Sequence, residues 1–312
     1  MNISENALNC LAAKTYKGIG LAWINDNLKG SLAKTDIVKL LQRKNIEVSE
    51  EEFEAEKRNI RQKIEKLGEA IDGVVGLGDE EFPEIPAGVK ASERPIALFY
   101  KGDISLIHSP RQNVAVIGVL NPTEQVVEDE RKVVAALVEQ GKCIVSGLAL
   151  GCDSVGHRET LNQKGKTVAF LSSPLNEINP PSNRPLAYEI VECGGLLVSE
   201  YYLKAYSKNE FLSRYVERDR LQAMFAQSIV LAASYAQRDF GCDSGSRHAM
   251  GKARAYGVTR YVVYDKNRDA QNPMFNLSRD EIASGAQIID PKGDVNLILP
   301  QAKVCEQTTF WG

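Results

Sequence analysis

Three short stretches of small residues in this sequence have the composition of phosphate-binding loops. They are Gly118, the stretch from Ser146 and Gly147 to Gly151, and Ser244-Gly245-Ser246. Each comes near the end of an apolar run or at the start of a helical one, where backbone amides and a helix N-terminus can bind an anion. Glycine also serves tight turns for steric reasons alone, so one such loop is weak evidence and three together count for more. We predict that the three loops converge on one anion site.

Asp153 and His157 follow the second of these stretches and lie four residues apart. This spacing places both side chains on one face of a helix, where a hydrogen bond between them is expected. An aspartate at the start of a helix is more often a cap than a catalytic acid. Since the nearby sequence offers no nucleophile, we interpret neither residue as catalytic.

Arg218 and Arg220 lie two residues apart in a predicted helix and therefore do not share a face of it. One of them can contact a phosphate while the other pairs with Glu200 or Glu217. Residues 201–260, which contain both arginines, carry 10 basic and 5 acidic residues in a chain whose net charge is −3. A basic patch on an acidic protein suits an anionic ligand, and an ordinary solvated face is the equally weighted alternative.

Strands and helices alternate through the part of the sequence that carries these residues. Apolar runs that predict buried strands occupy residues 94–103, 114–117, 143–145, 167–171, 194–200, 228–233 and 259–264. Helical patterns lie between them, at residues 126–137, 153–161, 186–191, 211–225 and up to 255. This alternation predicts an α/β fold with a doubly wound, mostly parallel, Rossmann-like sheet.

The first 70 residues have a different pattern and predict a small helical N-terminal domain. Two helices flank Lys17-Gly18-Ile19-Gly20, an arrangement typical of a helix-hairpin-helix or SAM-like unit, although a purely structural hairpin has the same pattern. We predict a loop-rich connector and the first sheet strand in residues 71–110, the Rossmann domain in 111–300 and a tail in 301–312.

Composition excludes several classes of protein. No run of about 18 apolar residues is present, which argues against a membrane span, and the N-terminus does not resemble a secretory signal. The 6 cysteines include no Cys-x-x-Cys pair and the chain has 3 histidines, so we expect no metal site. Reduced cysteines in a cytoplasmic protein are the expected state.

Several of these motifs resemble those of the DprA/Smf family of DNA-processing proteins. The resemblance lies in Ser146-Gly147-Leu148-Ala149-Leu150-Gly151-Cys152-Asp153 with His157, in Asn183, in Arg218-Asp219-Arg220 and in Ser244-Gly245-Ser246. It implies an extended Rossmann fold that binds single-stranded DNA without catalysis or cofactor. It also implies a homodimer that protects incoming DNA and delivers it to a RecA-type recombinase in natural transformation.

The resemblance implies a set of DNA- or phosphate-binding residues. They are Gly118, Ser146, Gly147, Gly151, Asp153, His157, Asn183, Arg218, Arg220, Ser244, Gly245 and Ser246. The chain departs from the family pattern where Leu120 and Leu150 replace arginines, and where Asp219 replaces the asparagine between the two arginines.

A second function remains open from the sequence, because the wider fold group also contains binders and hydrolases of small nucleotides. Hydrolases of the LOG type carry a Pro-Gly-Gly-x-Gly-Thr motif with a catalytic glutamate. This chain has only Cys193-Gly194-Gly195, followed by Leu196, which disfavours hydrolysis. Sensing of a small nucleotide is therefore the alternative to DNA binding.

Overall fold

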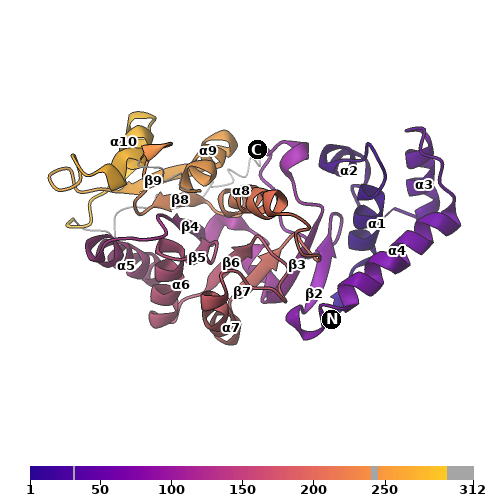
Figure 1. The fold of residues 1–312 in the computed structure, drawn as a ribbon, viewed down its shortest axis with the longest axis horizontal. Coiled ribbons are helices and arrows are strands. Elements are labelled where there is room, and N and C mark those ends of the chain that lie inside the picture. Colours follow the sequence, from indigo (N-terminus) through magenta and orange to yellow (C-terminus); the bar gives the residue numbers. More distant parts are fainter. Residues whose placement is uncertain (31, 240–244, 294–312) are drawn as a thin grey trace, which may run out of the picture.

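A single mixed sheet runs through the computed structural model, which describes residues 1–30, 32–239 and 245–293. Its strands lie in the order β1-β2-β3-β7-β6-β5-β4-β8-β9-β10 (Figure 1). The strands are β1 (Asn2–Ile3), β2 (Gly73–Gly76), β3 (Ala97–Gly102), β4 (Asn113–Ile117), β5 (Cys143–Ser146), β6 (Thr167–Leu171), β7 (Leu196–Ser199), β8 (Ser228–Leu231), β9 (Thr259–Val263) and β10 (Gln287–Ile289).

The chain winds outward in both directions from β4. It passes through β5, β6 and β7 on one side, then crosses to β8 on the other side and continues to β9 and β10. All of these strands pair in parallel, whereas β3 is antiparallel to both β2 and β7. The predicted doubly wound, mostly parallel α/β fold is confirmed.

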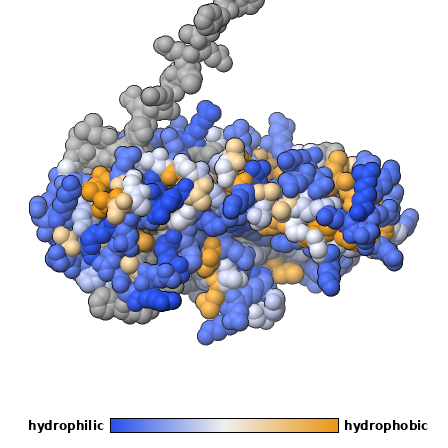
Figure 2. All heavy atoms as spheres, turned by 90° about the horizontal axis from the view of Figure 1, so that it is seen from above, coloured by the Kyte–Doolittle hydropathy of each residue, from blue (hydrophilic) through white to orange (hydrophobic). Residues whose placement is uncertain are grey.

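Helices cover both faces of this sheet. They are α1 (Glu5–Lys14), α2 (Leu21–Asn27), α3 (Lys34–Gln42), α4 (Glu50–Glu65), α5 (Glu124–Glu139), α6 (Cys152–Asn162), α7 (Arg184–Glu192), α8 (Lys208–Met224), α9 (Ser246–Tyr256) and α10 (Asn276–Ala283). None that the structure describes combines the length and apolar character needed to cross a bilayer. On the face seen in Figure 2, hydrophobic residues form small groups among hydrophilic ones.

Burial on both faces explains why the central strands are continuous apolar runs. In β4, Ala115 and Ile117 pack in one cluster with residues of α8 and α9, including Met224 and Met250. The alternate residues of β4, such as Val114, pack on the opposite face with residues of α5. A strand has side chains on both sides, so two apolar layers require every position to be apolar.

The N-terminal helices pack against the end of the sheet formed by β2, β3 and β7 (Figure 1). Their apolar residues share one buried cluster with Phe99 of β3 and Leu197 of β7. The turn between α1 and α2 includes Gly18 with φ of 87°, as the Gly-x-Gly pattern predicts. The proposed boundary between a helical domain and a connector near residue 70 stays a prediction.

Three strands of the sheet are not predicted by the sequence pattern, and one of them is β1, which lies in the segment predicted to be helical. β2 lies in the segment predicted as a loop-rich connector, because Gly73 and Gly76 have the appearance of loop residues. A Cβ on Gly76 would lie 2.2 Å from the backbone nitrogen of Ala7, so glycine lets α1 approach the strand closely. β10 follows the strand predicted to be the last and pairs in parallel with β9.

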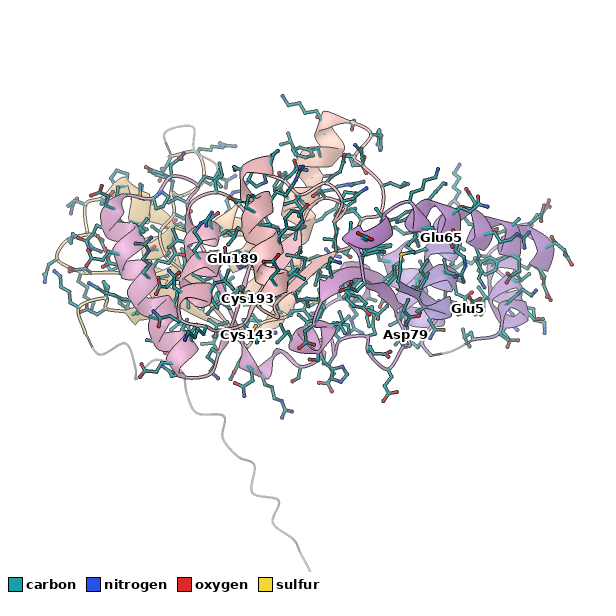
Figure 3. All side chains as sticks on the ribbon, turned by 90° about the horizontal axis from the view of Figure 1, so that it is seen from below. Glu5, Glu65, Asp79, Cys143, Glu189 and Cys193 are labelled. Carbon is teal, nitrogen blue, oxygen red and sulfur yellow. The ribbon has the colours of Figure 1, made fainter. Side chains whose placement is uncertain are left out.

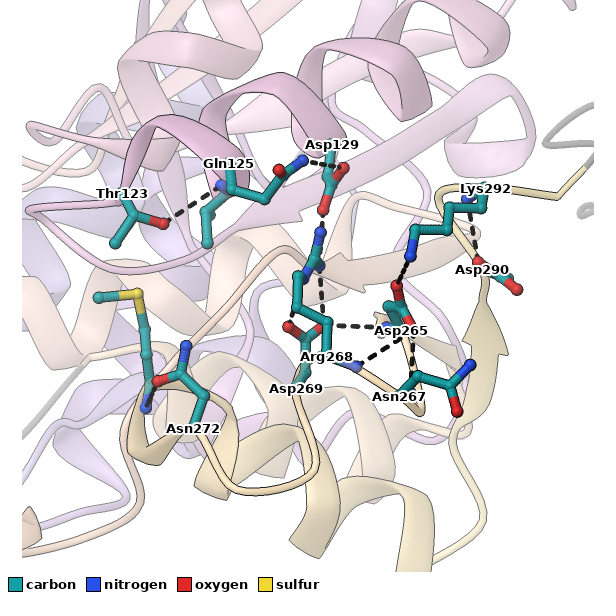
Figure 4. A network of polar contacts seen from close by, with 12 residues as sticks. Thr123, Gln125, Asp129, Asp265, Asn267, Arg268, Asp269, Asn272, Asp290 and Lys292 are labelled. Atoms are coloured by element: carbon teal, nitrogen blue, oxygen red, sulfur yellow. Dashed lines mark hydrogen bonds and ion pairs between the residues drawn. The ribbon is translucent and has the colours of Figure 1, made fainter.

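A polar network joins the first turns of α5 to the segment after β9 (Figure 4). The guanidinium of Arg268 contacts Oδ2 of Asp129 at 2.7 Å and both carboxylate oxygens of Asp269 at 2.7 and 2.8 Å. Lys292 pairs with Asp265 at 2.5 Å, and this hydrogen-bonded ion pair holds the pKa of Asp265 at about 2. Arg268 therefore compensates two buried carboxylates, those of Asp129 and Asp269.

We predict that Arg268→Ala lowers the free energy of unfolding by about 2–4 kcal/mol, because two buried carboxylates lose their cation. Urea denaturation monitored by circular dichroism measures the change. Arg158→Ala is the matched control, because Arg158 is exposed on α6 and forms no ion pair within the described residues. The control should change stability by less than about 0.5 kcal/mol. Equal stability of the two variants would contradict a structural role for Arg268.

Candidate functional site

A cavity of about 540 Å³ lies at the carboxyl ends of β4 and β5, covered by α8 and the start of α9. We call it the switch-point cavity, because the winding of the sheet reverses between β4 and β8 and ligands of such sheets bind at that reversal. Gly118, Leu150, Gly245 and Ser246 line it, so the structure brings the three predicted loops together. Ser244 lies outside the described residues.

Arg218 enters the switch-point cavity from α8 and is 4% exposed. Its Nη1 donates to the carbonyl oxygen of Phe170 at 3.2 Å and lies 3.8 Å from Oδ2 of Asp153. Its Nε lies 3.2 Å from Oδ1 of Asp219. One buried guanidinium therefore faces two carboxylates at the floor of the cavity.

The two carboxylates differ from ordinary aspartates in their protonation. Burial raises the pKa of Asp219 to about 7, and the charge of Asp153 adds to this rise while Arg218 opposes it. Burial also raises the pKa of Asp153, against the attraction of Arg218 and the hydrogen bonds that it accepts. The floor of the cavity thus loses negative charge as the pH falls toward 6.

The carboxylate of Asp153 stabilises the loop that precedes α6 and does not cap the helix itself. Its Oδ2 accepts hydrogen bonds from the backbone nitrogens of Gly147 at 3.1 Å and Ala149 at 3.2 Å. The expectation of a helix cap is therefore corrected, since the N-cap of α6 is Gly151. In this loop, the amides of Gly147 and Ala149 are therefore bonded to an internal carboxylate and not left open for a phosphate.

His157 lies beneath the cavity, fully buried between α6 and the sheet. Its Nδ1 lies 2.7 Å from Oγ1 of Thr167, so the expected hydrogen bond to Asp153 is not the contact that it makes. Burial, together with the charge of Arg218, lowers the pKa of His157 to about 3 and keeps the ring neutral. Its direct contact with a ligand remains a prediction that this geometry does not favour.

The loop from Ser146 to Gly151 is fixed by buried side chains. Ser146 Oγ donates to the carbonyl oxygen of Val116 at 2.7 Å. Asn183 Nδ2 lies 2.9 and 3.0 Å from the carbonyl oxygens of Leu148 and Ala149. Gly151 has φ of 70°, and a Cβ there would lie 2.3 Å from the carbonyl oxygen of Val119. These residues shape the loop, and glycine is required for the close approach at Gly151.

Gly118 and Ser246 meet on the other side of the cavity. Ser246 Oγ donates to the carbonyl oxygen of Gly118 at 3.1 Å. The thiol of Cys152 and the carboxyl of Glu130 are buried beneath Gly118. A Cβ on Gly118 would lie 2.5 Å from Sγ of Cys152, and Cys152 in turn contacts Glu130. Burial raises the pKa of Glu130 well above its usual value, which favours the neutral form of this carboxyl.

Arg220 points away from the switch-point cavity. Its Nη1 and Nη2 each donate to a carboxylate oxygen of Glu200 at 2.7 Å, and its Nε donates to the carbonyl oxygen of Glu93 at 2.7 Å. The prediction that Arg218 and Arg220 face different sides of the helix is confirmed. A phosphate contact by Arg220 stays a prediction, and it would require breaking a bidentate ion pair.

The basic character of residues 201–260 is largely compensated in the fold. Ion pairs join Lys204 to Glu177, Arg214 to Glu210, Arg218 to Asp219, Arg220 to Glu200, Lys252 to Glu93, and Arg254 and Arg260 to Glu281. Most of the 10 basic residues of this segment therefore have carboxylate partners. The sum of charges overstates the positive potential that a ligand would meet.

Apolar side chains surround the opening of the cavity. Leu120 and Leu150 are 57% and 46% exposed, and Leu212 and Val216 of α8 are also exposed. Two further residues, Tyr215 and Gln222, line the cavity beside Arg218 and are absent from the predicted set. They lie three residues before and four residues after Arg218, on the same face of α8. This spacing could have predicted from the sequence that they line the same cavity as Arg218.

The chain shares its sequence pattern with known DNA-processing proteins. Residues 73–298 match the family model for DNA recombination-mediator protein A. The chain belongs to this family. Protein Smf of Synechocystis sp. is 39% identical over 125 residues, which are 39% of this chain and 31% of that protein. DNA processing protein DprA of Streptococcus pneumoniae is 36% identical over 109 residues, which are 35% of this chain and 37% of that protein. The chain thus aligns with about a third of the length of these curated relatives.

Two solved structures of the family have a similar fold. The structure of DNA processing protein A from Streptococcus pneumoniae has a TM-score of 0.70 at 22% identity and covers 93% of this chain and 95% of its own. A structure from Helicobacter pylori, described as showing a single-stranded DNA binding mode, has a TM-score of 0.57 at 24% identity. It covers 72% of this chain and 94% of its own. At these identities, the likeness supports the fold.

Gly147, which lies against Arg218, and Gly245, which lines the cavity, should respond differently to substitution. A Cβ on Gly147 would lie 1.1 Å from Nη1 of Arg218, whereas one on Gly245 would meet, among the described residues, only Oδ2 of Asp219, at 3.2 Å. Gly147→Ala should therefore displace Arg218 and lower the free energy of unfolding by about 1–3 kcal/mol. Gly245→Ala should cost less than about 1 kcal/mol. Thermal denaturation compares them, and equal losses would contradict the tight packing at Gly147.

Asp219 should make anion binding depend on pH. Its carboxylate is charged above pH 7 and neutral below, so affinity for oligo-dT should rise about tenfold between pH 8 and pH 6. Asp219→Asn should bind tightly at both pH values, as measured by fluorescence anisotropy. His248 also lines the cavity, with Arg218 and Asp153, so His248→Gln is the control that should keep the pH dependence. A pH dependence retained in Asp219→Asn would refute this role.

Proposed function

We propose that this protein binds single-stranded DNA at the switch-point cavity and acts in DNA processing during natural transformation. Family membership and the cavity at the reversal of the sheet are the observations that support this function. The related protein from Helicobacter pylori is described as having a single-stranded DNA binding mode, which adds support. The bound strand would cross the opening of the cavity, where the loops after β4 and β5 meet α8 and α9.

The finer parts of the proposal concern partners. We propose that the protein protects incoming DNA in the cytoplasm, acts as a homodimer and transfers the strand to a RecA-type recombinase. The description of the family as a recombination mediator supports the transfer step.

A binding role without catalysis fits the chemistry of the cavity. Asp153 is occupied by two backbone amides, and Arg218 by carboxylates and a carbonyl oxygen. His157 is neutral, buried and hydrogen-bonded to Thr167, so it is poorly placed as a general base. These groups position the loops rather than activate a substrate.

Binding of a small nucleotide is the second candidate, and the floor and rim of the cavity favour it. Leu120 and Leu150 stand where the family has arginines, and Arg218 is compensated by Asp153 and Asp219. A cavity of about 540 Å³ with an apolar rim has the volume of a small-ligand site. A planar base could pack against the apolar rim with little help from cations.

The rim provides a gain-of-function test of the two candidates. The double variant Leu120→Arg with Leu150→Arg should raise affinity for oligo-dT about tenfold. The slope of log affinity against log salt should become steeper by about 1.4, because each of the two added phosphate contacts contributes about 0.7. Both leucines are exposed, so the changes should not impair folding. Fluorescence anisotropy at several salt concentrations measures both quantities.

The control adds the same charge elsewhere, with Tyr188→Arg and Leu203→Arg, which are also exposed. It should raise affinity less than the rim variant does. An unaltered protein that binds mononucleotides far more tightly than oligo-dT would overturn DNA binding in favour of the nucleotide function.

A further inference from the structure

A second cavity lies at the amino ends of the parallel strands, on the edge of the sheet opposite the switch-point cavity. Its volume is about 700 Å³, and the segments that lead into β4, β5 and β6 form it. Lys142, Lys164 and Lys166 line it, and we call it the lysine cavity. Figure 3 views the molecule from below and labels Cys143, which lines this cavity at the start of β5, and Cys193, which precedes β7.

Two lysines of this cavity, Lys142 and Lys166, donate hydrogen bonds to neutral groups. Lys142 Nζ donates to Oε1 of Gln112 at 3.4 Å, and Lys166 Nζ donates to the carbonyl oxygen of Cys193 at 2.7 Å. Within the described residues, none of the three lysines forms an ion pair, and the lining contains no aspartate or glutamate. Their positive charge is therefore available to a ligand.

Two lining residues, Ser105 and Gln163, donate hydrogen bonds to carboxylates beside the cavity. Asp103 accepts hydrogen bonds from the backbone nitrogen of Ser105 at 3.0 Å and from its Oγ at 2.6 Å. Glu159 accepts one from Nε2 of Gln163 at 2.7 Å. The contrast with the switch-point cavity is direct, because there one arginine faces two carboxylates.

We infer that the lysine cavity is a second contact site for the phosphates of single-stranded DNA, and this inference rests on the proposed function. Exposed lysine amines are mobile point charges, and they attract phosphates without reading bases. Lys164 and Lys166 are exposed, so binding a phosphate there requires little desolvation of the protein. For a DNA strand that contacted both edges of the sheet, most of the positive charge that balances its phosphates would come from the lysine cavity.

The test replaces Lys142, Lys164 and Lys166 together by glutamine. Glutamine at position 166 retains a donor for the carbonyl oxygen of Cys193, so the loop should stay folded, which circular dichroism checks. Affinity for a fluorescent oligo-dT should fall at least about tenfold at low salt. The magnitude of the slope of log affinity against log salt should decrease by about 2, because each of the three lost phosphate contacts contributes about 0.7.

The matched control is Lys34→Gln with Lys39→Gln and Lys132→Gln, three lysines that are already paired with carboxylates. This variant has the same net charge as the test variant and should bind like the unaltered protein. A gain-of-function variant, Ser109→Lys, adds a cation to the lining and should raise both affinity and slope.

The outcomes separate this inference from the proposed function. If the unaltered protein binds oligo-dT and the lysine variant binds equally well, the inference fails while DNA binding stands. An equal loss of affinity for oligo-dT in the lysine variant and its control would mean that binding depends on net charge alone. That result would also contradict a DNA contact site at the lysine cavity. If polyglutamate competes for the lysine cavity and oligo-dT does not, the surface serves an acidic protein. Absence of DNA binding by the unaltered protein overturns both proposals.

Discussion

The burial of Arg218 between two carboxylates is the constraint on which the switch-point cavity depends. Its guanidinium occupies the space that a side chain at position 147 would need, and it balances the charge of Asp153. Asp153 in turn holds the amides of Gly147 and Ala149. Removing a buried cation from such a cluster leaves its carboxylates uncompensated, so the loop and the arginine must form together.

This arrangement changes what the basic segment of the chain can do. Several cations of residues 201–260 pair with carboxylates that come from other elements, as Arg220 does with Glu200 and Lys252 with Glu93. These pairs join α8 and α9 to β7 and to the segment before β3. Their energy contributes to the packing of the domain, and little of their charge remains for long-range attraction of DNA.

The sequence was sufficient to predict the parallel core, because strands buried on both faces are continuous apolar runs. It failed at β2, where glycines that admit α1 look like loop residues, and at β10, where three residues pair on the edge. The meeting of the three loops was predictable from the rule that ligands bind at the carboxyl ends. The pairing of one of the two arginines with Glu200 was also predicted, and Arg220 is the arginine that forms it. Its contact with the carbonyl oxygen of Glu93 was not predictable, because that residue lies 127 residues away and only the fold brings them together.

The two edges of the parallel sheet differ in how charge is used. At the carboxyl edge, charges are buried and compensated, so they fix the shape of a cavity whose opening is apolar. At the amino edge, Lys164 and Lys166 are exposed, and Lys142 and Lys166 donate to neutral groups. These amines therefore stay hydrated and can move to contact a ligand. Buried charges lose much of their Coulombic gain to desolvation, whereas exposed amines gain from counterion release when they bind a polyanion. In the DNA-binding function that we propose, shape at one edge and charge at the other would let the protein hold a strand tightly without reading its sequence.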